Sequence, residues 1–179
     1  MSKFAVLILF VFCFVLLEHS AYAQSAQART DALIAALAKT KYKKKEKKSV
    51  SIEIYIDIKS EAVVKNDPGE YSGVYAADGY RLELKVDGGG RVEGSGYDGR
   101  MNDARRNFTL RDARIEGALL TATKVFESGE TENFEAVFNN RTLTSGKNPT
   151  QIEVSETRFG LGFIQTNGDW TNRIFLELK

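Results

Sequence analysis

Hydrophobic and polar residues alternate strictly in the middle of this chain, between residues 80 and 86. The apolar positions are Tyr80, Leu82, Leu84 and Val86, and the charged positions between them are Arg81, Glu83 and Lys85. Asp78-Gly79 precedes this segment and Asp87-Gly88-Gly89-Gly90 follows it, and both are typical of tight turns that need a positive φ. The alternation predicts a β-strand with one apolar and one charged face, joined to antiparallel neighbours by short turns.

The same pattern recurs from Tyr71 to Phe138 and again near the end of the chain. Further strands are predicted at residues 71–75, 92–97, 108–115, 119–126, 134–138, 152–154, 159–163 and 174–178. Turns are expected at Asn139-Asn140 and in the 145–149 loop, while Gly94 and Gly96 indicate a bend or a close backbone approach. We therefore predict a mainly β protein, an antiparallel up-and-down meander that closes into a barrel of eight or nine strands. A two-sheet sandwich is the alternative.

The segment from Val50 to Ile58 gives the strongest strand signal in the chain. Its apolar positions alternate without a break and are Val50, Ile52, Ile54, Ile56 and Ile58. A strand with this many branched aliphatic side chains on an open edge would promote aggregation. We therefore expect other strands to pair with it and to bury its isoleucine face.

Residues 1–23 have the pattern of a secretory signal peptide. Lys3 is followed by an apolar run from Phe4 to Leu17 and by Ala21-Tyr22-Ala23, which is typical of a cleavage site. An uncleaved membrane anchor is the alternative, although the run is shorter than the roughly 20 residues that a spanning helix needs. We expect cleavage near Ala23 and export to the periplasm or out of the cell. The expected division is a signal peptide at 1–23, a helix with a lysine-rich linker at 24–48, and a barrel domain at 49–179.

Two different segments are expected between the signal peptide and the barrel. Residues 26–38 are alanine-rich, carry Leu33, Ile34 and Leu37 on one side, and predict a short amphipathic helix. The lysine run after it carries a charge of +5 in a chain of net charge +1, and its candidate contact residues are Lys43, Lys44, Lys45, Lys47 and Lys48. We interpret the run as a solvated linker, with docking on an anionic membrane surface as the alternative. Nucleic acid is not expected as a partner, because no aromatic platform for bases accompanies the charge.

The chemistry open to the exported chain is narrow, because its single histidine and single cysteine, His19 and Cys13, lie in the signal peptide. Their removal excludes a Ser-His-Asp triad, a cysteine nucleophile and a zinc site with thiolate or imidazole ligands. Paired carboxylates for glycoside hydrolysis could come from four glutamates, namely Glu127, Glu130, Glu132 and Glu135. Glutamates on exposed strands and turns are usually only solvated. We therefore expect a protein that is not an enzyme, with no catalytic residue, no metal and no cofactor.

The strand opening Gly73-Val74-Tyr75, the meander after it and Arg173 on the last strand resemble the lipocalin and avidin-type barrels. In lipocalins a Gly-x-Trp opens the first strand, and an arginine of the last strand packs over the tryptophan ring. By this resemblance Tyr75 would replace the tryptophan and Arg173 would be its partner. The resemblance covers roughly residues 71–179 and implies a ligand pocket at one mouth of the barrel, without identifying the ligand.

The candidate ligand contacts of such a barrel are aromatic residues and one arginine. They are Tyr75, Tyr80, Tyr97, Trp170 and Arg173. Our first hypothesis is an exported, non-enzymatic barrel that binds a small or amphiphilic ligand inside the barrel or at its mouth. The alternative is a barrel filled by its own side chains, which binds a protein or associates with the cell envelope through its surface. The barrel interior separates the two hypotheses, since the first requires a hollow interior and the second a solid one.

Overall fold

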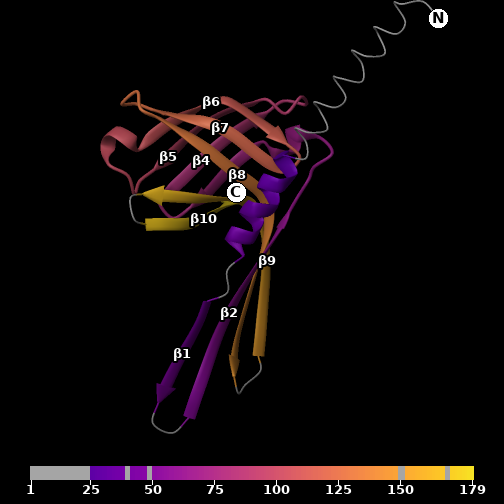
Figure 1. Ribbon diagram of the computed structural model, residues 1–179, viewed down its shortest axis with the longest axis vertical. Helices are drawn as coiled ribbons and strands as arrows, with labels where there is room; N and C mark the ends of the chain where they lie inside the picture. The colour runs from indigo at the N-terminus through magenta and orange to yellow at the C-terminus, as the bar shows by residue number, and fades with distance from the viewer. Residues whose placement is uncertain (1–24, 39–40, 48–49, 149–151, 168–169) are drawn as a thin grey trace, which may run out of the picture.

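A computed structural model describes residues 25–38, 41–47, 50–148, 152–167 and 170–179 of the chain (Figure 1). Within these residues the main feature is an antiparallel sheet of ten strands. The strands are β1 (Lys41–Lys47), β2 (Val50–Ala62), β3 (Gly73–Ala77), β4 (Tyr80–Val86), β5 (Val92–Asp98), β6 (Asn107–Glu116), β7 (Leu119–Phe126), β8 (Thr131–Asn148), β9 (Ile152–Asn167) and β10 (Trp170–Leu178). Two short 3-10 helices, η1 (Pro68–Tyr71) and η2 (Asp103–Arg105), lie between strands, and a longer N-terminal helix covers residues 25–37.

Eight of the described strands, β3 to β10, close into a barrel. Each strand pairs with the next one in the chain, and β10 pairs back with β3. The pairing of β8 with β9 is the longest of these contacts and runs from Ala136 to Lys147 on the β8 side. The predicted antiparallel meander and its closure into a barrel are therefore confirmed.

Strands β8 and β9 continue beyond the barrel and, with β1 and β2, form a protruding arm (Figure 1). The edge of β8 changes partner at Phe138. The Phe138 N–H donates to the carbonyl of Ala118 at 2.9 Å, and its carbonyl accepts from the N–H of Val63 at 2.9 Å. Before this residue β8 pairs with β7, and after it β8 pairs with β2 as far as Asn148. The predicted turn at Asn139-Asn140 is wrong, because β2 supplies the hydrogen bonds that β7 no longer offers.

The lysine run is a strand in the structure. Residues Lys41 to Lys47 form β1 and pair with β2 from Ile56 to Val50. The interpretation of this run as a linker is therefore wrong, because the backbone of β2 offers a free edge to which it adds. Lys48 lies outside the described residues, and the side chains of Lys43, Lys44, Lys45 and Lys47 are not described. Contact with an anionic membrane surface stays a prediction.

The isoleucine strand, β2, is paired on both edges, with β1 and with β8, as expected. Its apolar face is not fully buried, since Ile56 is 38% exposed and Ile58 is half-buried. The prediction of burial is wrong for Ile56, because the arm extends beyond the barrel, where no second layer of the described chain covers this side chain. The side chains of Val50, Ile52 and Ile54 are outside the described residues.

The barrel interior is packed with side chains. Its buried residues are Tyr71, Tyr75, Tyr80, Leu82, Leu84, Val86, Val92, Phe108, Ala113, Ile115, Leu120, Phe126, Phe134, Ala136, Phe138, Leu161, Phe163, Ile174 and Leu176. Tyr71 stacks on Phe138 with 4.1 Å between the ring centroids. Gly96 leaves room for the ring of Phe108, because a Cβ at position 96 would lie only 2.2 Å from Cζ of that ring. The close approach that Gly96 predicts is therefore confirmed.

The N-terminal helix lies on the outside of the barrel, across β8 (Figure 1). Its Leu37 packs with Ala118 and with Val137 of β8. Arg29 of the helix forms an ion pair with Glu135 of the same strand. The predicted single amphipathic helix is confirmed. A search of the described residues finds no helix whose length and hydrophobicity would let it cross a membrane.

Candidate functional site

A buried lysine lies near one mouth of the barrel, where β7 ends and β8 begins. On β7, Leu120 and Phe126 belong to the core, and Lys124 lies on their side of the strand. Only 2% of Lys124 is exposed. Its Nζ lies between 4.5 and 5.8 Å from the centroids of four rings, those of Phe134, Phe108, Phe163 and Tyr80. Rings at these distances attract an ammonium group through the negative charge of their faces.

Two carboxylates accompany this lysine. Glu132 Oε1 lies 3.8 Å from Lys124 Nζ, and Arg105 of η2 donates to Glu132 Oε2 at 2.6 Å. Asp98, also buried, accepts hydrogen bonds from the Arg100 guanidinium at 2.8 and 3.0 Å. Burial alone would raise the pKa of Asp98, but its hydrogen bonds, above all those from Arg100, hold the pKa below its usual value. This end of the barrel therefore holds a network of buried and paired charges.

These charged groups close the mouth of the barrel. Burial lowers the pKa of Lys124, and the attraction of Glu132 offsets that effect only in part. Arg105 covers the same end from η2, with its Cζ 4.7 Å from the centroid of Phe126. Aromatic side chains and Lys124 thus fill the space that a ligand inside the barrel or in this mouth would need. The expectation of a ligand in the interior is not supported by the structure.

Replacing Lys124 by methionine is expected to raise the free energy of unfolding at pH 7 by about 1–3 kcal/mol, because it removes a buried charge whose desolvation outweighs its attractions. A lysine with a lowered pKa makes the protein more stable as pH rises toward about 10.5, the value in the unfolded chain. The advantage of Lys124→Met should therefore shrink between pH 8 and about pH 10. Urea unfolding of both proteins across this range measures the effect.

The exposed Lys85 provides the control for this prediction, since Lys85→Met changes the charge equally and should alter stability by less than about 0.5 kcal/mol. If Lys124→Met were destabilised by more than that amount at every pH, the lysine would be a net stabiliser of the closed mouth.

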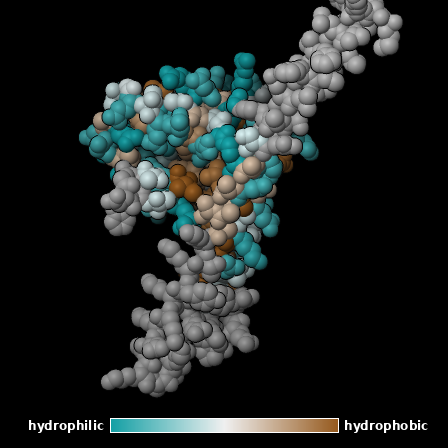
Figure 2. All heavy atoms as spheres, in the orientation of Figure 1, coloured by the Kyte–Doolittle hydropathy of each residue, from teal (hydrophilic) through white to brown (hydrophobic). Residues whose placement is uncertain are grey.

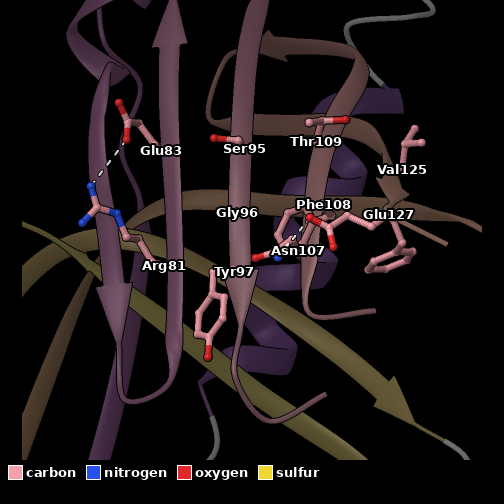
Figure 3. Close-up of a pocket in the computed structure, with 11 residues that line it drawn as sticks. Arg81, Glu83, Ser95, Gly96, Tyr97, Asn107, Phe108, Thr109, Val125 and Glu127 are labelled. Carbon is pink, nitrogen blue, oxygen red and sulfur yellow. Dashed lines mark hydrogen bonds and ion pairs between the residues drawn. The ribbon is translucent and has the colours of Figure 1, made fainter. Parts of the chain in front are cut away.

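A groove of about 450 Å3 lies on the outer face of the barrel, across β4 to β7 (Figure 3). Its size is within the range of sites for small ligands. Most of its lining comes from outward-facing side chains of the four strands, namely Arg81, Glu83, Ser95, Tyr97, Asn107, Thr109 and Val125, and from Glu127 just after β7. Gly96 and the rings of Phe108 and Phe126 complete the lining. The groove therefore has an apolar floor beside Gly96, where no side chain stands between the groove and the core.

Tyr97 presents an exposed aromatic ring in this groove and is 42% exposed. Two polar pairs lie on either side of it (Figure 3). Arg81 donates to Glu83 at 3.4 Å on β4, and Asn107 of β6 donates from Nδ2 to Glu127, the residue after β7, at 3.1 Å. The groove thus combines one accessible ring face with donors and acceptors on both sides.

The other candidate ligand residues lie elsewhere. Tyr75 and Tyr80 are buried in the barrel core and are not on an accessible surface. The backbone of Trp170 begins β10, but its side chain is outside the described residues. Arg173 is exposed on the outside of β10, and its Nε donates to the carbonyl of Ala36, at the end of the N-terminal helix, at 2.5 Å.

The expected contact of Arg173 with Tyr75 is wrong. Ile174 and Leu176 belong to the core, so that Arg173 faces away from the barrel interior. Tyr75 lies inside the barrel, and its hydroxyl donates to the carbonyl of Tyr71 at 2.7 Å. The eight-stranded antiparallel barrel is present, but this lipocalin-like arginine contact is not.

The four glutamates considered for hydrolysis each have a basic or amide partner. Glu127 accepts from Asn107, and Glu135 pairs with Arg29. Glu130 and Glu132 both pair with Arg105, at 3.2 and 2.6 Å. The described residues include no cluster of three or more histidine, cysteine, aspartate or glutamate side chains that could hold a metal ion.

Sequence reasoning missed Ser95, Asn107 and Glu127 as neighbours of Tyr97. The alternation of each strand gives the direction of these side chains, since they stand next to residues of the apolar face. The register between neighbouring strands, which decides which side chains lie next to Tyr97, could not be read from the sequence. Asn107 lies directly opposite Tyr97 in the pairing of β6 with β5.

No family model matches the chain, and searches of curated proteins and of solved structures find no significant match.

Proposed function

We propose that this protein is an exported, non-enzymatic binding module that takes a small amphiphilic ligand in the groove across β4 to β7. The observation that carries the proposal is the exposed ring of Tyr97 between two polar pairs, over a floor that reaches the apolar core at Gly96. A filled barrel interior supports it, because binding then has to occur on the outer surface.

A sugar unit of a glycan is the chemical class that suits this groove best. Carbon-bound hydrogens on one face of a sugar ring carry a partial positive charge and pack on the negative face of an aromatic ring such as Tyr97. Hydroxyl groups both donate and accept, which suits a site where Arg81 and Asn107 donate and Glu83 and Glu127 accept. An aliphatic ligand would displace water from these polar groups without replacing the hydrogen bonds that the water makes.

Export and the absence of catalysis are parts of the proposal. Export is supported by the apolar run and the cleavage pattern of residues 1–23. A binding role is supported by the pairing of each glutamate near the groove, because a carboxylate held by a partner is less available to donate or accept a proton during a reaction.

Tyr97→Ala is expected to weaken glycan binding by about tenfold or more, because it removes the stacking face and the apolar area of the ring. The probes are three neutral oligosaccharides, cellopentaose, chitopentaose and maltopentaose, each titrated by isothermal calorimetry. Tyr97→Phe is the matched control, since it keeps the ring and should retain binding within about threefold.

Two results would contradict the proposal. One is that none of the three oligosaccharides binds the wild-type protein at about 10 mM. The other is that Tyr97→Ala binds as tightly as Tyr97→Phe, which would place the ligand away from the ring.

A second candidate function, protein binding through the arm, is favoured by two exposed aliphatic side chains. Ile56 of β2 and Val154 of β9 are 38% and 60% exposed. Both lie opposite Ser145 in their pairings with β8, so that they share one face of the arm. Sedimentation velocity of the wild type and of Val154→Asp tests whether this face joins two copies of the chain. Identical monomeric behaviour of the two proteins would count against self-association.

A further inference from the structure

A second hollow, separate from the groove, lies under the end of the N-terminal helix. It has a volume of about 270 Å3 and is formed between Leu37 of the helix and the outer faces of β2, β8 and β10. Hydrophobic residues gather beside the helix on this face of the molecule (Figure 2). The side chains that line the hollow with polar atoms include Ser60, Asn139, Arg141 and Arg173.

Asn139 is the unusual residue of this hollow. It is completely buried, and neither its Nδ2 nor its Oδ1 has a hydrogen-bond partner among the described residues. Its position on β8 faces outward, next to Gly162, where an added Cβ would come within 2.8 Å of Asn139 Oδ1. A buried polar group without a partner is costly, and native structures seldom keep one unless something else satisfies it.

The charged side chains that line the hollow are all positive. Arg141 and Arg173 both line it, and its lining contains no aspartate or glutamate. The guanidinium of Arg141 lies over the ring of Phe175, 5.4 Å from the centroid. Within the described part of the chain, no carboxylate forms an ion pair with either arginine.

The structural role of Arg173 accounts for only part of this arrangement. Its Nε donates to the Ala36 carbonyl and so caps the end of the helix. That contact uses one nitrogen, and within the described residues no hydrogen bond of the other guanidinium nitrogens is found. It gives no reason for the second arginine, Arg141, or for the unpaired amide of Asn139.

We propose that this hollow binds a small organic oxyanion, a carboxylate or a phosphate monoester, that also carries a hydroxyl or amino group. Arg141 and Arg173 pair with the oxyanion, and Asn139 Nδ2 donates to it. Asn139 Oδ1 accepts the hydrogen bond of the ligand's own donor, which an oxyanion alone could not supply. The apolar part of the ligand lies against Leu37 and Phe175.

The test uses the full exported chain and three probes: lactate, which has both groups, propionate, which lacks the hydroxyl, and inorganic phosphate. Amide and arginine Nε resonances are followed by NMR during each titration. Lactate is expected to shift the Asn139 side-chain amide and the Nε signals of Arg141 and Arg173, and to bind at least about threefold more tightly than propionate. Phosphate is expected to shift the same signals, because its monoanion is both an oxyanion and a donor.

Three variants separate binding from folding. Arg141→Gln should weaken lactate binding about tenfold or more. Arg158→Gln is the matched control, because Arg158 lies opposite Arg141 on β9, is already paired with Glu156 and Glu177, and is not part of the hollow. Asn139→Leu removes the unpaired amide and is expected to raise the melting temperature while it weakens lactate binding by a similar factor.

Three results would overturn the proposal: no shift at these signals with any probe at about 10 mM, equal losses from Arg141→Gln and Arg158→Gln, or lactate binding that survives Asn139→Leu. The groove provides an internal check, because Tyr97→Ala lies on other strands and should leave lactate binding unchanged. The two sites can therefore fail independently.

Discussion

Replacing Phe138 by alanine is expected to lower the free energy of unfolding by about 3–5 kcal/mol, which is a large part of the 5–15 kcal/mol that typical domains possess. The Phe138 ring is fully buried and stacks on Tyr71. It also contacts the rings of Tyr75 and Phe159, at 5.7 and 6.4 Å between centroids.

The position of Phe138 adds to the expected loss. Its backbone marks the point where β8 leaves β7 and begins to pair with β2. A cavity there would loosen the junction between the barrel and the arm. Urea unfolding followed by circular dichroism measures the effect, and Ile56→Ala on the exposed face of the arm is the control, expected to cost less than about 1 kcal/mol. A loss below about 1 kcal/mol for Phe138→Ala would contradict the packing described for this ring.

A steep loss of stability above about pH 10.5 is the second large effect that we expect. Burial raises the pKa of Tyr71, Tyr75 and Tyr80 above the ordinary value of 10. In the unfolded chain these phenols ionise near pH 10, while in the folded chain they stay neutral. The folded state therefore keeps protons that the unfolded state has lost, and stability falls as pH rises. For three groups the slope approaches about 4 kcal/mol per pH unit.

The lowered pKa of Lys124 makes stability rise with pH, but only up to about pH 10.5. The net fall in stability therefore appears above that pH.

Two variants separate the contributions of the tyrosines to this fall. The Tyr80 hydroxyl has no hydrogen-bond partner among the described residues, so Tyr80→Phe should be neutral or stabilising at pH 7. Tyr75→Phe loses the bond to the Tyr71 carbonyl and should cost about 1 kcal/mol at pH 7. Both should flatten the alkaline slope by about one third. Unfolding curves at pH 9, 10 and 11 measure these slopes, and a wild-type stability that stays constant to pH 11 would contradict the account.

The sequence predicts those parts of the fold that depend on local alternation. Tyr80 to Val86 forms β4 with the expected pattern of buried and exposed residues. Alternation also fixes the direction of Lys124 and of Arg173. Leu120, Ala122, Lys124 and Phe126 share one side of a strand, and this places the lysine in the core. The inward direction of Ile174 and Leu176 likewise turns Arg173 outward.

The parts that could not be predicted depend on contacts between distant segments. β8 continues through Asn139-Asn140 because β2, far earlier in the chain, takes over from β7 as its partner. The lysine run becomes a strand because β2 has a second edge. Tyr97 was a candidate from its residue type alone, but the groove around it depends on the register of four strands. The hollow at Asn139 depends on where the N-terminal helix docks, which no local pattern specifies.

We propose that ligands bind on the outer surface of the barrel, whose interior is filled by side chains. Methyl NMR of the leucines tests it directly, with dodecanoate as an amphiphilic probe and cellopentaose as a sugar probe. The account predicts that the methyl signals of Leu82, Leu120 and Leu161, which are fully buried in the core, do not shift with either probe, whereas the backbone amides of Ser95, Tyr97 and Asn107 shift with cellopentaose. Saturable shifts of the three leucine methyls with dodecanoate would show a ligand inside the barrel and contradict the claim.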